Sequence, residues 1–275
     1  MGIFMHLHAK VYYLTDILVH TSSQIMGIGA SSMVKNLILF DKLHVIRPST
    51  PENKKRDLIW RYQKYLEELA KGFPDTTMKI KEIRESDKRV VLELDGPDEM
   101  FLHNMLRKKV GTIQEFKDLR VETVHRGLMV DVSKFGFGIF ADCGIQEPRT
   151  DVLLSLHELR EQLCAGKKRS IREIIQGCGF EENFPVFVEI TDIDFHRREA
   201  SGKLASRTLN FLQKMVKEGL DGIFLSGETK GQFKKALIGK GHLRDIVSME
   251  RHAFLEHVVV LKPGTSAPGI IAEIG

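Results

Sequence analysis

Apolar and polar positions follow two different periods along the chain, and the period predicts the element. From Asp57 to Lys71 apolar side chains recur every three or four residues, which is typical of an amphipathic helix, and Gly72 ends the pattern. Short apolar runs between Gly, Pro or polar residues predict strands. In the first 113 residues we expect further helices near 21–37 and 96–110, and strands at Lys10–Leu14, Leu43–Ile46, Met78–Ile83 and Arg89–Leu94. Because helices and strands alternate, residues 1–113 are predicted to form an α/β module.

The middle of the chain carries mainly strand patterns. Strands are expected at Leu119–Val124, Gly127–Val132, Phe137–Asp142, Asp151–Leu156 and Val186–Ile193. Between the last two, helical spacing predicts helices over Leu156–Leu163 and Ser170–Gln176, within an insertion at 156–182. Five short strands with one helical insertion predict a small closed β-barrel over residues 114–195.

The last section returns to mixed patterns. Glu199–Glu218 has apolar residues on one side only and predicts a long amphipathic helix. Further helices are expected within 227–240 and over Ala267–Ile274, and strands at Gly222–Leu225, Ile246–Glu250 and Leu255–Lys262. Residues 196–275 are therefore predicted to form a C-terminal basic α/β module. The expected fold class is α+β and multidomain, with a central barrel flanked by N-terminal and C-terminal α/β modules.

Composition narrows the class of protein. Of the 275 residues, 42% are hydrophobic and 28% charged, which is ordinary for a soluble globular protein. No apolar run approaches the roughly 18 residues that a membrane span needs, and no secretion signal opens the sequence. Cys143, Cys164 and Cys178 are too scattered for a disulfide framework. We therefore expect a cytoplasmic protein with no membrane partner.

The basic surplus lies in the last third of the chain. The formal net charge is +4, yet between His196 and Arg251 twelve Lys and Arg stand against six acids. A well-solvated surface explains this surplus as readily as an anionic partner does.

Residues Gly127–Gly144 carry the most informative pattern. One glycine opens a strand, and the next strand reads Phe-Gly-Ile-Phe-Ala-Asp over Phe137–Asp142. This stretch resembles the S1 RNA-binding domain, a variant of the OB-fold. The resemblance implies that Phe137 and Phe140 stack on RNA bases. We assign Lys134, three positions before Phe137, to RNA binding as well.

Two details leave that implication open. Phe137 and Phe140 are three positions apart, so an ideal strand would turn them to opposite faces and make one of them a core residue, unless a bulge or strong coiling intervenes. In the motif that follows in the S1 family, the usual contact residue is absent and Ser155 stands in its place, followed by His157. This departure weakens the RNA prediction more than the fold prediction.

Basic residues between the two inserted helices form a second candidate for RNA contact. A cationic loop beside a barrel groove would attract a phosphate backbone, although a solvated helix connection is an equal alternative. The complete set assigned to RNA binding is Lys134, Phe137, Phe140, Lys167, Lys168, Arg169 and Arg172.

A possible phosphate site follows the strand at Gly222–Leu225. Gly227–Gly231 leads from a strand into a helix, and the N-terminus of a helix in such a position can bind phosphate. The segment lacks the P-loop pattern. A plain turn is the simpler interpretation. The phosphate-binding candidates are Lys230, Lys234, Lys240, His242 and Arg244.

No known catalytic or metal pattern is present in the sequence. No nucleophile elbow occurs, and the eleven histidines make no ligand spacing with a third residue nearby. We assign no catalytic residue and expect neither a metal nor another cofactor.

The tail from Gly241 to Gly275, together with Asp95–Asn104 and the S1-like centre, resembles an archaeal protein family known as a domain of unknown function. The resemblance implies an archaeal cytoplasmic protein and brings no activity with it.

Three functions remain open from the sequence. The first is a non-catalytic protein of translation, RNA processing or transcription that binds single-stranded RNA on the barrel. The second is a protein-interaction adaptor of a ribosome or RNA polymerase assembly. The third, less favoured, is an RNA- or nucleotide-directed enzyme that uses the basic C-terminal loops.

Overall fold

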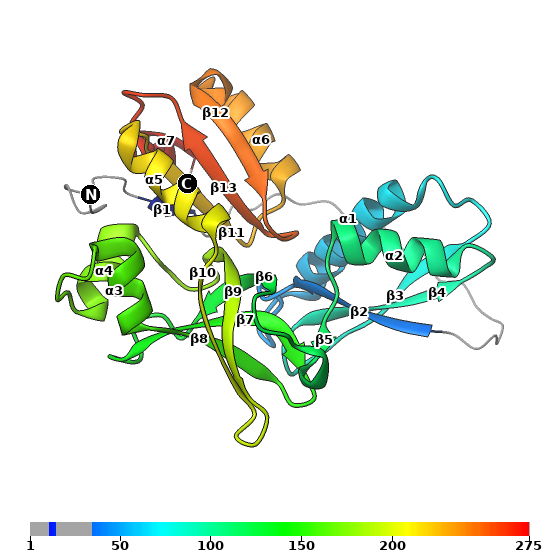
Figure 1. Ribbon diagram of the computed structural model, residues 1–275. Coiled ribbons are helices and arrows are strands. Elements are labelled where there is room, and N and C mark those ends of the chain that lie inside the picture. The colour runs from blue at the N-terminus through cyan, green and yellow to red at the C-terminus, as the bar shows by residue number, and fades with distance from the viewer. Residues whose placement is uncertain (1–10, 15–34, 275) are drawn as a thin grey trace. The chain divides into compact units, whose positions relative to one another are not determined.

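The computed structural model describes residues 11–14 and 35–274, and the chain divides into two compact units (Figure 1). Of the described residues, one unit holds 35–113 and Ala253–Leu255. The other holds Val11–Leu14, Gln114–His252 and 256–274. The division into three domains therefore stays a prediction. Among the described residues, no helix is both long and apolar enough to cross a membrane.

The smaller unit is an antiparallel sheet with two helices. Its strands lie in the order β2 (Lys35–Lys42), β4 (Arg89–Asp95) and β3 (Thr77–Ile83), and its helices are α1 (Glu52–Ala70) and α2 (Glu99–Lys109). Buried side chains of the sheet and both helices form one core that includes Phe254 and Leu255. The ring of Phe254 lies 4.4 Å from that of Tyr62, centroid to centroid. The expected strands at Met78–Ile83 and Arg89–Leu94 are confirmed.

Two expectations for this unit are wrong. Leu43–Ile46 is a turn after β2, in which the Ile46 N–H donates to the Leu43 carbonyl, and the apolar run is explained by burial of Leu43 and Ile46 in the core. Leu37, expected in a helix, belongs to β2. The rest of that expected helix, up to Val34, lies outside the described residues.

The larger unit contains a closed five-stranded barrel. Around it the strands follow the order β6 (Val124–Val130), β7 (Gly138–Gln146), β8 (Thr150–Ser155), β10 (Glu199–Leu204) and β9 (Pro185–Asp194), which pairs again with β6. Neighbours are antiparallel except β8 and β10, which are parallel. A short strand, β5 (Gln114–Glu115), pairs with the far end of β7. The closed barrel expected from the sequence is confirmed.

One strand of the barrel, at Glu199–Leu204, was not predicted as a strand. These residues form β10, whereas the sequence predicted the first turns of a long helix there. Ala200, Gly202 and Leu204 are buried alternately, as in a strand. A Cβ on Gly202 would lie 2.6 Å from a methyl of Val188, so the strand requires glycine at this close contact. Tertiary packing thus overrides the helical pattern, and the helix α5 covers only Ser206–Lys217.

The prediction of a strand at Leu119–Val124 is also wrong. A 3₁₀ turn, η1 (Phe116–Asp118), and a loop precede β6, which begins only at Val124. Glu122 has a φ of 62°, a left-handed conformation that interrupts an extended chain. Leu119 is buried in the barrel core, which accounts for the apolar signal.

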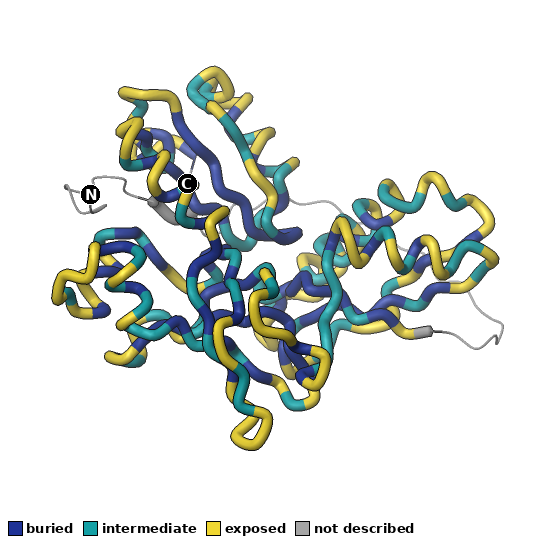
Figure 2. The backbone as a smooth tube through the Cα atoms, in the orientation of Figure 1, coloured by how far each residue is buried: buried dark blue, intermediate teal, exposed yellow. Residues whose placement is uncertain are grey.

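The helical insertion agrees with the sequence. The helices α3 (Leu156–Cys164) and α4 (Ile171–Cys178) lie between β8 and β9, and their buried side chains join the barrel core. Beyond β9 the chain forms an exposed hairpin tip before β10 (Figure 2). All three cysteines are buried and reduced.

The C-terminal part of this unit is a four-stranded sheet. Its order is β1 (Val11–Leu14), β11 (Gly222–Ser226), β13 (Glu256–Leu261) and β12 (Ile246–Arg251). The elements between and after these strands are α6 (Lys230–Gly239), the 3₁₀ turn η2 (His242–Asp245) and α7 (Ala267–Ile274). The strands and helices expected between 222 and 274 are confirmed. Of the strand expected at Lys10–Leu14, the described residues Val11–Leu14 form β1, which pairs with β11 and not with the strands β2–β4 of the smaller unit.

Candidate nucleic-acid interface

Three phenylalanine rings gather where the chain enters β7. The ring centroids of Phe135 and Phe137 are 5.3 Å apart, those of Phe135 and Phe140 5.5 Å, and those of Phe137 and Phe140 6.1 Å. Phe137 is 54% exposed, and Phe135 and Phe140 are half-buried. We call these three residues the aromatic cluster. It presents apolar ring surface to solvent, as binding surfaces do.

The backbone explains how two phenylalanines three positions apart can share one face. Phe137 precedes β7, so strand alternation does not govern it, and its carbonyl accepts the Leu156 N–H at 2.8 Å. Within β7, Ile139 and Ala141 belong to the barrel core, which turns Phe140 outward. Neither Phe137 nor Phe140 is a core residue.

Close contact between strands fixes the start of β7. A Cβ on Gly138 would lie 2.5 Å from the carbonyl oxygen of Leu154, so only glycine lets β7 approach β8 this closely. Phe140 pairs in register with Leu153 on one side and Val130 on the other. The outer face beside the aromatic cluster is therefore apolar as well.

A tight turn places a cation at the aromatic cluster. Asp131 and Ser133 have φ angles of 54° and 69°, and the Lys134 N–H donates to the Asp131 carbonyl at 3.1 Å. The Lys134 ammonium lies 3.0 Å from an Asp131 carboxylate oxygen and 5.3 Å from the centroid of the Phe135 ring. Lys134 is exposed, so this ion pair is weak and leaves the ammonium accessible to an anionic ligand.

The position of the usual S1 contact residue has a structural role here. The Ser155 hydroxyl accepts the Glu158 N–H and so caps α3. His157 lies in the first turn of that helix and is exposed. The helix start thus replaces the contact that the S1 pattern implies.

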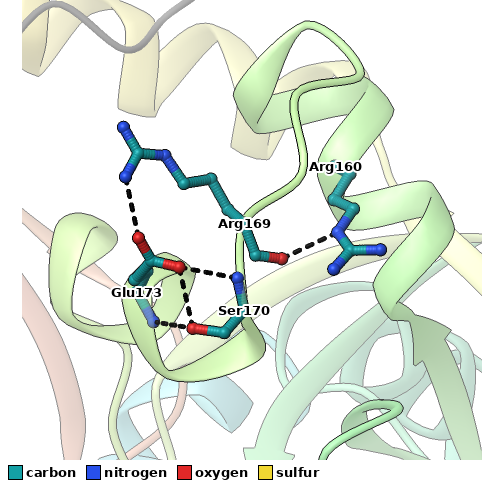
Figure 3. Close-up of polar contacts among 4 residues, drawn as sticks. All are labelled: Arg160, Arg169, Ser170 and Glu173. Carbon is teal, nitrogen blue, oxygen red and sulfur yellow. Dashed lines mark hydrogen bonds and ion pairs between the residues drawn. The ribbon is translucent and has the colours of Figure 1, made fainter.

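The basic loop between α3 and α4 is held by a compact polar network (Figure 3). The Arg169 guanidinium pairs with a Glu173 carboxylate oxygen at 2.7 Å, and the Arg160 Nε donates to the Arg169 carbonyl at 2.7 Å. The other Glu173 oxygen accepts the Ser170 N–H at 2.8 Å and the Ser170 hydroxyl at 2.9 Å. The Ser170 backbone, the Arg169 guanidinium and the Ser170 hydroxyl, in that order of effect, lower the pKa of Glu173 to about 2.

This network separates two kinds of basic residue in the loop. Arg169 is paired with a carboxylate and helps to fix the loop, whereas Lys167, Lys168 and Arg172 are exposed. These last three make no ion pair with any residue that the structure describes. Of the predicted loop residues, they are the ones available to a phosphate backbone.

The five C-terminal phosphate candidates do not form one site. Lys230 begins α6, and its ammonium donates to the Met249 carbonyl at 3.3 Å. His242 and Arg244 lie in η2, beyond the other end of that ten-residue helix, which is about 15 Å long. Lys234 and Lys240 are exposed on α6 and just after it. The structure therefore places Lys230 at one end of α6 and His242 and Arg244 beyond the other end, so the five residues do not surround one phosphate.

His242 is already engaged by two carboxylates. Its Nδ1 lies 3.0 Å from an Asp245 oxygen and its Nε2 lies 3.1 Å from a Glu273 oxygen. These contacts, Asp245 first and Glu273 second, raise the pKa of His242 above its usual value. Two acids beside the ring disfavour an anionic ligand at this position.

Sequence reasoning missed Phe135. Its signal was present, since Phe135 stands two positions before Phe137 and directly after Lys134, but the S1-like pattern was read from Phe137 onward. No group of three or more His, Cys, Asp or Glu within the described ranges could hold a metal ion.

The C-terminal part of the chain matches a known protein family. Residues 220–275 match the family model described as the DUF2110 C-terminal domain. The match begins just before β11 and runs through α6, β12, β13 and α7, so it leaves out the barrel. No curated protein matches the chain. The resemblance of the tail to a domain-of-unknown-function family is thus confirmed.

Proposed function

We propose that the chain is a non-catalytic RNA-binding protein and that its barrel is an S1-like OB module that binds single-stranded RNA on the aromatic cluster. Its setting is a translation, RNA-processing or transcription assembly. The observation that carries this proposal is the group of three adjacent, partly exposed phenylalanine rings with a lysine beside them.

The topology supports an OB-type barrel. The first three strands pair in sequence, the fifth pairs with both the third and the fourth, and the fourth returns to the first. Helices stand between the third and fourth strands. A closed five-stranded barrel with this strand order is what we expect of an OB-fold, and it supports the proposal. In OB-folds the face of strands two and three and the loop before strand two bind oligonucleotides.

The chemistry supports single-stranded RNA over a duplex. Exposed rings can stack only on bases that are unpaired and splayed out. Stacking contributes about 1–3 kcal/mol per base, and nearby lysines attract the phosphate backbone. Lys134, Lys167, Lys168 and Arg172 are exposed cations on the same unit as the aromatic cluster.

The test is a fluorescence-anisotropy titration of a short single-stranded RNA at low and moderate salt. We expect salt-sensitive binding by the wild type and a loss of at least about 30-fold in Phe137→Ala/Phe140→Ala, because two stacking contacts of about 1 kcal/mol or more are removed. The thermal melt of the double variant serves as the folding control. Absence of binding by a folded wild type would contradict the proposal.

A protein-interaction adaptor is the second candidate. The apolar surroundings of Phe140, formed by Val130 and Leu153, favour it, because an apolar patch also suits a protein partner. In that case the double variant would lose a protein partner of the ribosome or RNA polymerase, and RNA titrations would show no effect of the aromatic cluster.

An enzyme built on the C-terminal loops lacks support. Lys230 and His242 lie at opposite ends of α6, and His242 is paired with Asp245 and Glu273. Catalytic groups must converge on one reacting atom, and these residues do not.

A further inference from the structure

A second group of cationic and aromatic side chains lies on β6, β9, α5 and the turn after β12. Arg126 of β6 pairs in register with Phe187 of β9. The guanidinium carbon of Arg207 lies 4.3 Å from the centroid of the Phe187 ring, and the His252 ring lies 6.3 Å from it. Arg126 donates through Nη1 to the His252 carbonyl at 3.0 Å. We call Arg126, Phe187, Arg207 and His252 the arginine patch.

The arginine patch is held in place by backbone contacts. The Phe187 N–H donates to the Thr208 hydroxyl at 2.8 Å, and that hydroxyl donates to the Phe187 carbonyl at 3.3 Å. The same carbonyl accepts the Ala205 N–H at 2.8 Å. The first turn of α5 is thus fixed on β9, and this attachment places Arg207 over the ring. The arrangement is preorganised, which lowers the entropy lost on binding a ligand.

Arg207 gives the arginine patch an exposed positive charge. Arg207 is exposed and makes no ion pair with a described residue, and the first turn of α5 contains no acid. Burial first, then Arg207 and Arg126, lower the pKa of His252 to about 4, so its ring is neutral at physiological pH. A guanidinium stacked on an aromatic face keeps its N–H edge available for bidentate contact with phosphate.

We propose that the arginine patch binds a phosphate group, with Arg207 as the donor and Arg126 and His252 as neighbours. This inference rests on the proposed function for the source of the phosphate, since a backbone phosphate of the RNA bound at the aromatic cluster is the expected ligand. The recognition chemistry is that of any phosphate, so free phosphate serves as an independent probe. Arg126 and Val130 lie on the same side of β6, about 13 Å apart, and Val130 pairs with Phe140.

The first test measures RNA binding as a function of salt. Arg207→Gln removes one cation from an exposed position, and Lys217→Gln, at the other end of α5, is the matched control for charge. We expect Arg207→Gln to weaken RNA binding about tenfold and to lower the slope of log affinity against log salt by about 0.7, the value for one phosphate contact with a single strand. Lys217→Gln should leave the slope unchanged. Equal slopes in Arg207→Gln and the wild type would overturn the RNA-backbone assignment.

The second test uses inorganic phosphate and reads His252 directly. Its ring resonances are followed by NMR through a pH titration, in phosphate and in chloride of the same ionic strength. A bound phosphate should raise the pKa of His252 in the wild type and in Lys217→Gln, but not in Arg207→Gln. No rise in the wild type, or the same rise in Arg207→Gln, would overturn the phosphate site.

The two tests separate this inference from the proposed function. Phe137→Ala/Phe140→Ala should lose affinity for RNA, and phosphate should still raise the pKa of its His252. If RNA binds at the aromatic cluster while phosphate leaves His252 unchanged, the phosphate site is wrong and the RNA proposal stands. If phosphate acts on His252 and RNA does not bind, the RNA proposal is wrong and the phosphate site stands.

Discussion

The aromatic cluster and the basic residues around α6 were both candidate sites, and the structure treats them in opposite ways. At the start of β7, rings from a turn and a strand meet within about 6 Å of one another, and a lysine joins them. Around α6, Lys230 and His242 lie at opposite ends of the helix, and His242 is paired with acids. A site requires convergence of side chains, and a dense run of basic residues in sequence does not supply it.

The largest expected difference between the two regions is the change in the free energy of unfolding when a glycine is replaced by alanine. Gly138→Ala places a Cβ 2.5 Å from the Leu154 carbonyl oxygen, so we expect a loss of about 1–3 kcal/mol in the free energy of unfolding. Gly231→Ala, in α6, meets nothing within 4 Å and should be neutral or stabilise by up to about 1 kcal/mol. Urea denaturation of the two variants measures both changes. Equal stabilities would show that close packing does not fix the start of β7.

The next effect concerns the member of the aromatic cluster that sequence reasoning missed. Phe135→Ala removes the ring that contacts both Phe137 and Phe140 and that lies beside Lys134. We expect about a tenfold loss of affinity for single-stranded RNA, since one stacking surface is lost. Phe195→Ala, at the exposed hairpin tip between β9 and β10, is the control for removal of an exposed phenylalanine. A loss equal to that of the control would confine the site to Phe137 and Phe140.

A smaller effect compares two pairs of lysines of the same charge. Lys167→Gln/Lys168→Gln removes exposed cations from the loop between α3 and α4, and Lys234→Gln/Lys240→Gln removes exposed cations from the α6 region. We expect the first pair to lower the salt slope of RNA binding by about 1.4 and the second to leave it unchanged. The reverse result would move the interface to the C-terminal sheet and contradict the comparison drawn above.

The smallest effect concerns the pH dependence at His242. Because its folded-state pKa is raised, its ion pairs stabilise the fold fully below pH ~6.5, and that contribution is lost as the pH rises through the raised pKa. Glu273→Gln should bring the pKa of His242 closer to its usual value, which NMR titration measures. It should also lower the melting temperature more at mildly acidic pH than at mildly alkaline pH. An unchanged pKa would show that Glu273 does not hold the ring.

The sequence predicted the local elements well where local pattern and final packing agree. The barrel strands β7, β8 and β9, the helices α3 and α4 and most of the C-terminal elements follow from apolar runs and caps, because neighbours in sequence decide them. The prediction of a helix over Glu199–Leu204 was wrong because packing of Gly202 against Val188 and Val152 overrides the helical pattern. Leu119 and Leu43 gave apolar signals that reflect burial of loop residues rather than strands.

The candidate site was predictable only in part for a related reason. Phe137 and Phe140 were identified by an S1-like pattern. The two rings share one face only because Phe137 lies before the strand, and the spacing of residues in the sequence does not show where the strand begins. Arg126, Phe187, Arg207 and His252 lie far apart in sequence and meet only through strand pairing and the attachment of α5 to β9. Such non-local pairing leaves no mark in a single sequence. Arg169, assigned to RNA, pairs with Glu173 four residues later, and this local contact helps to fix the loop.

The most direct test of the central claim replaces the rings while keeping apolar side chains. Phe137→Leu/Phe140→Leu retains apolar contact surface at the aromatic cluster but removes the flat faces on which bases stack. We predict that this variant, compared with the wild type by RNA anisotropy titration at one moderate salt concentration, loses nearly as much affinity as Phe137→Ala/Phe140→Ala while its melting temperature changes little. Wild-type affinity in the leucine variant would contradict base stacking and would favour an apolar surface for a protein partner.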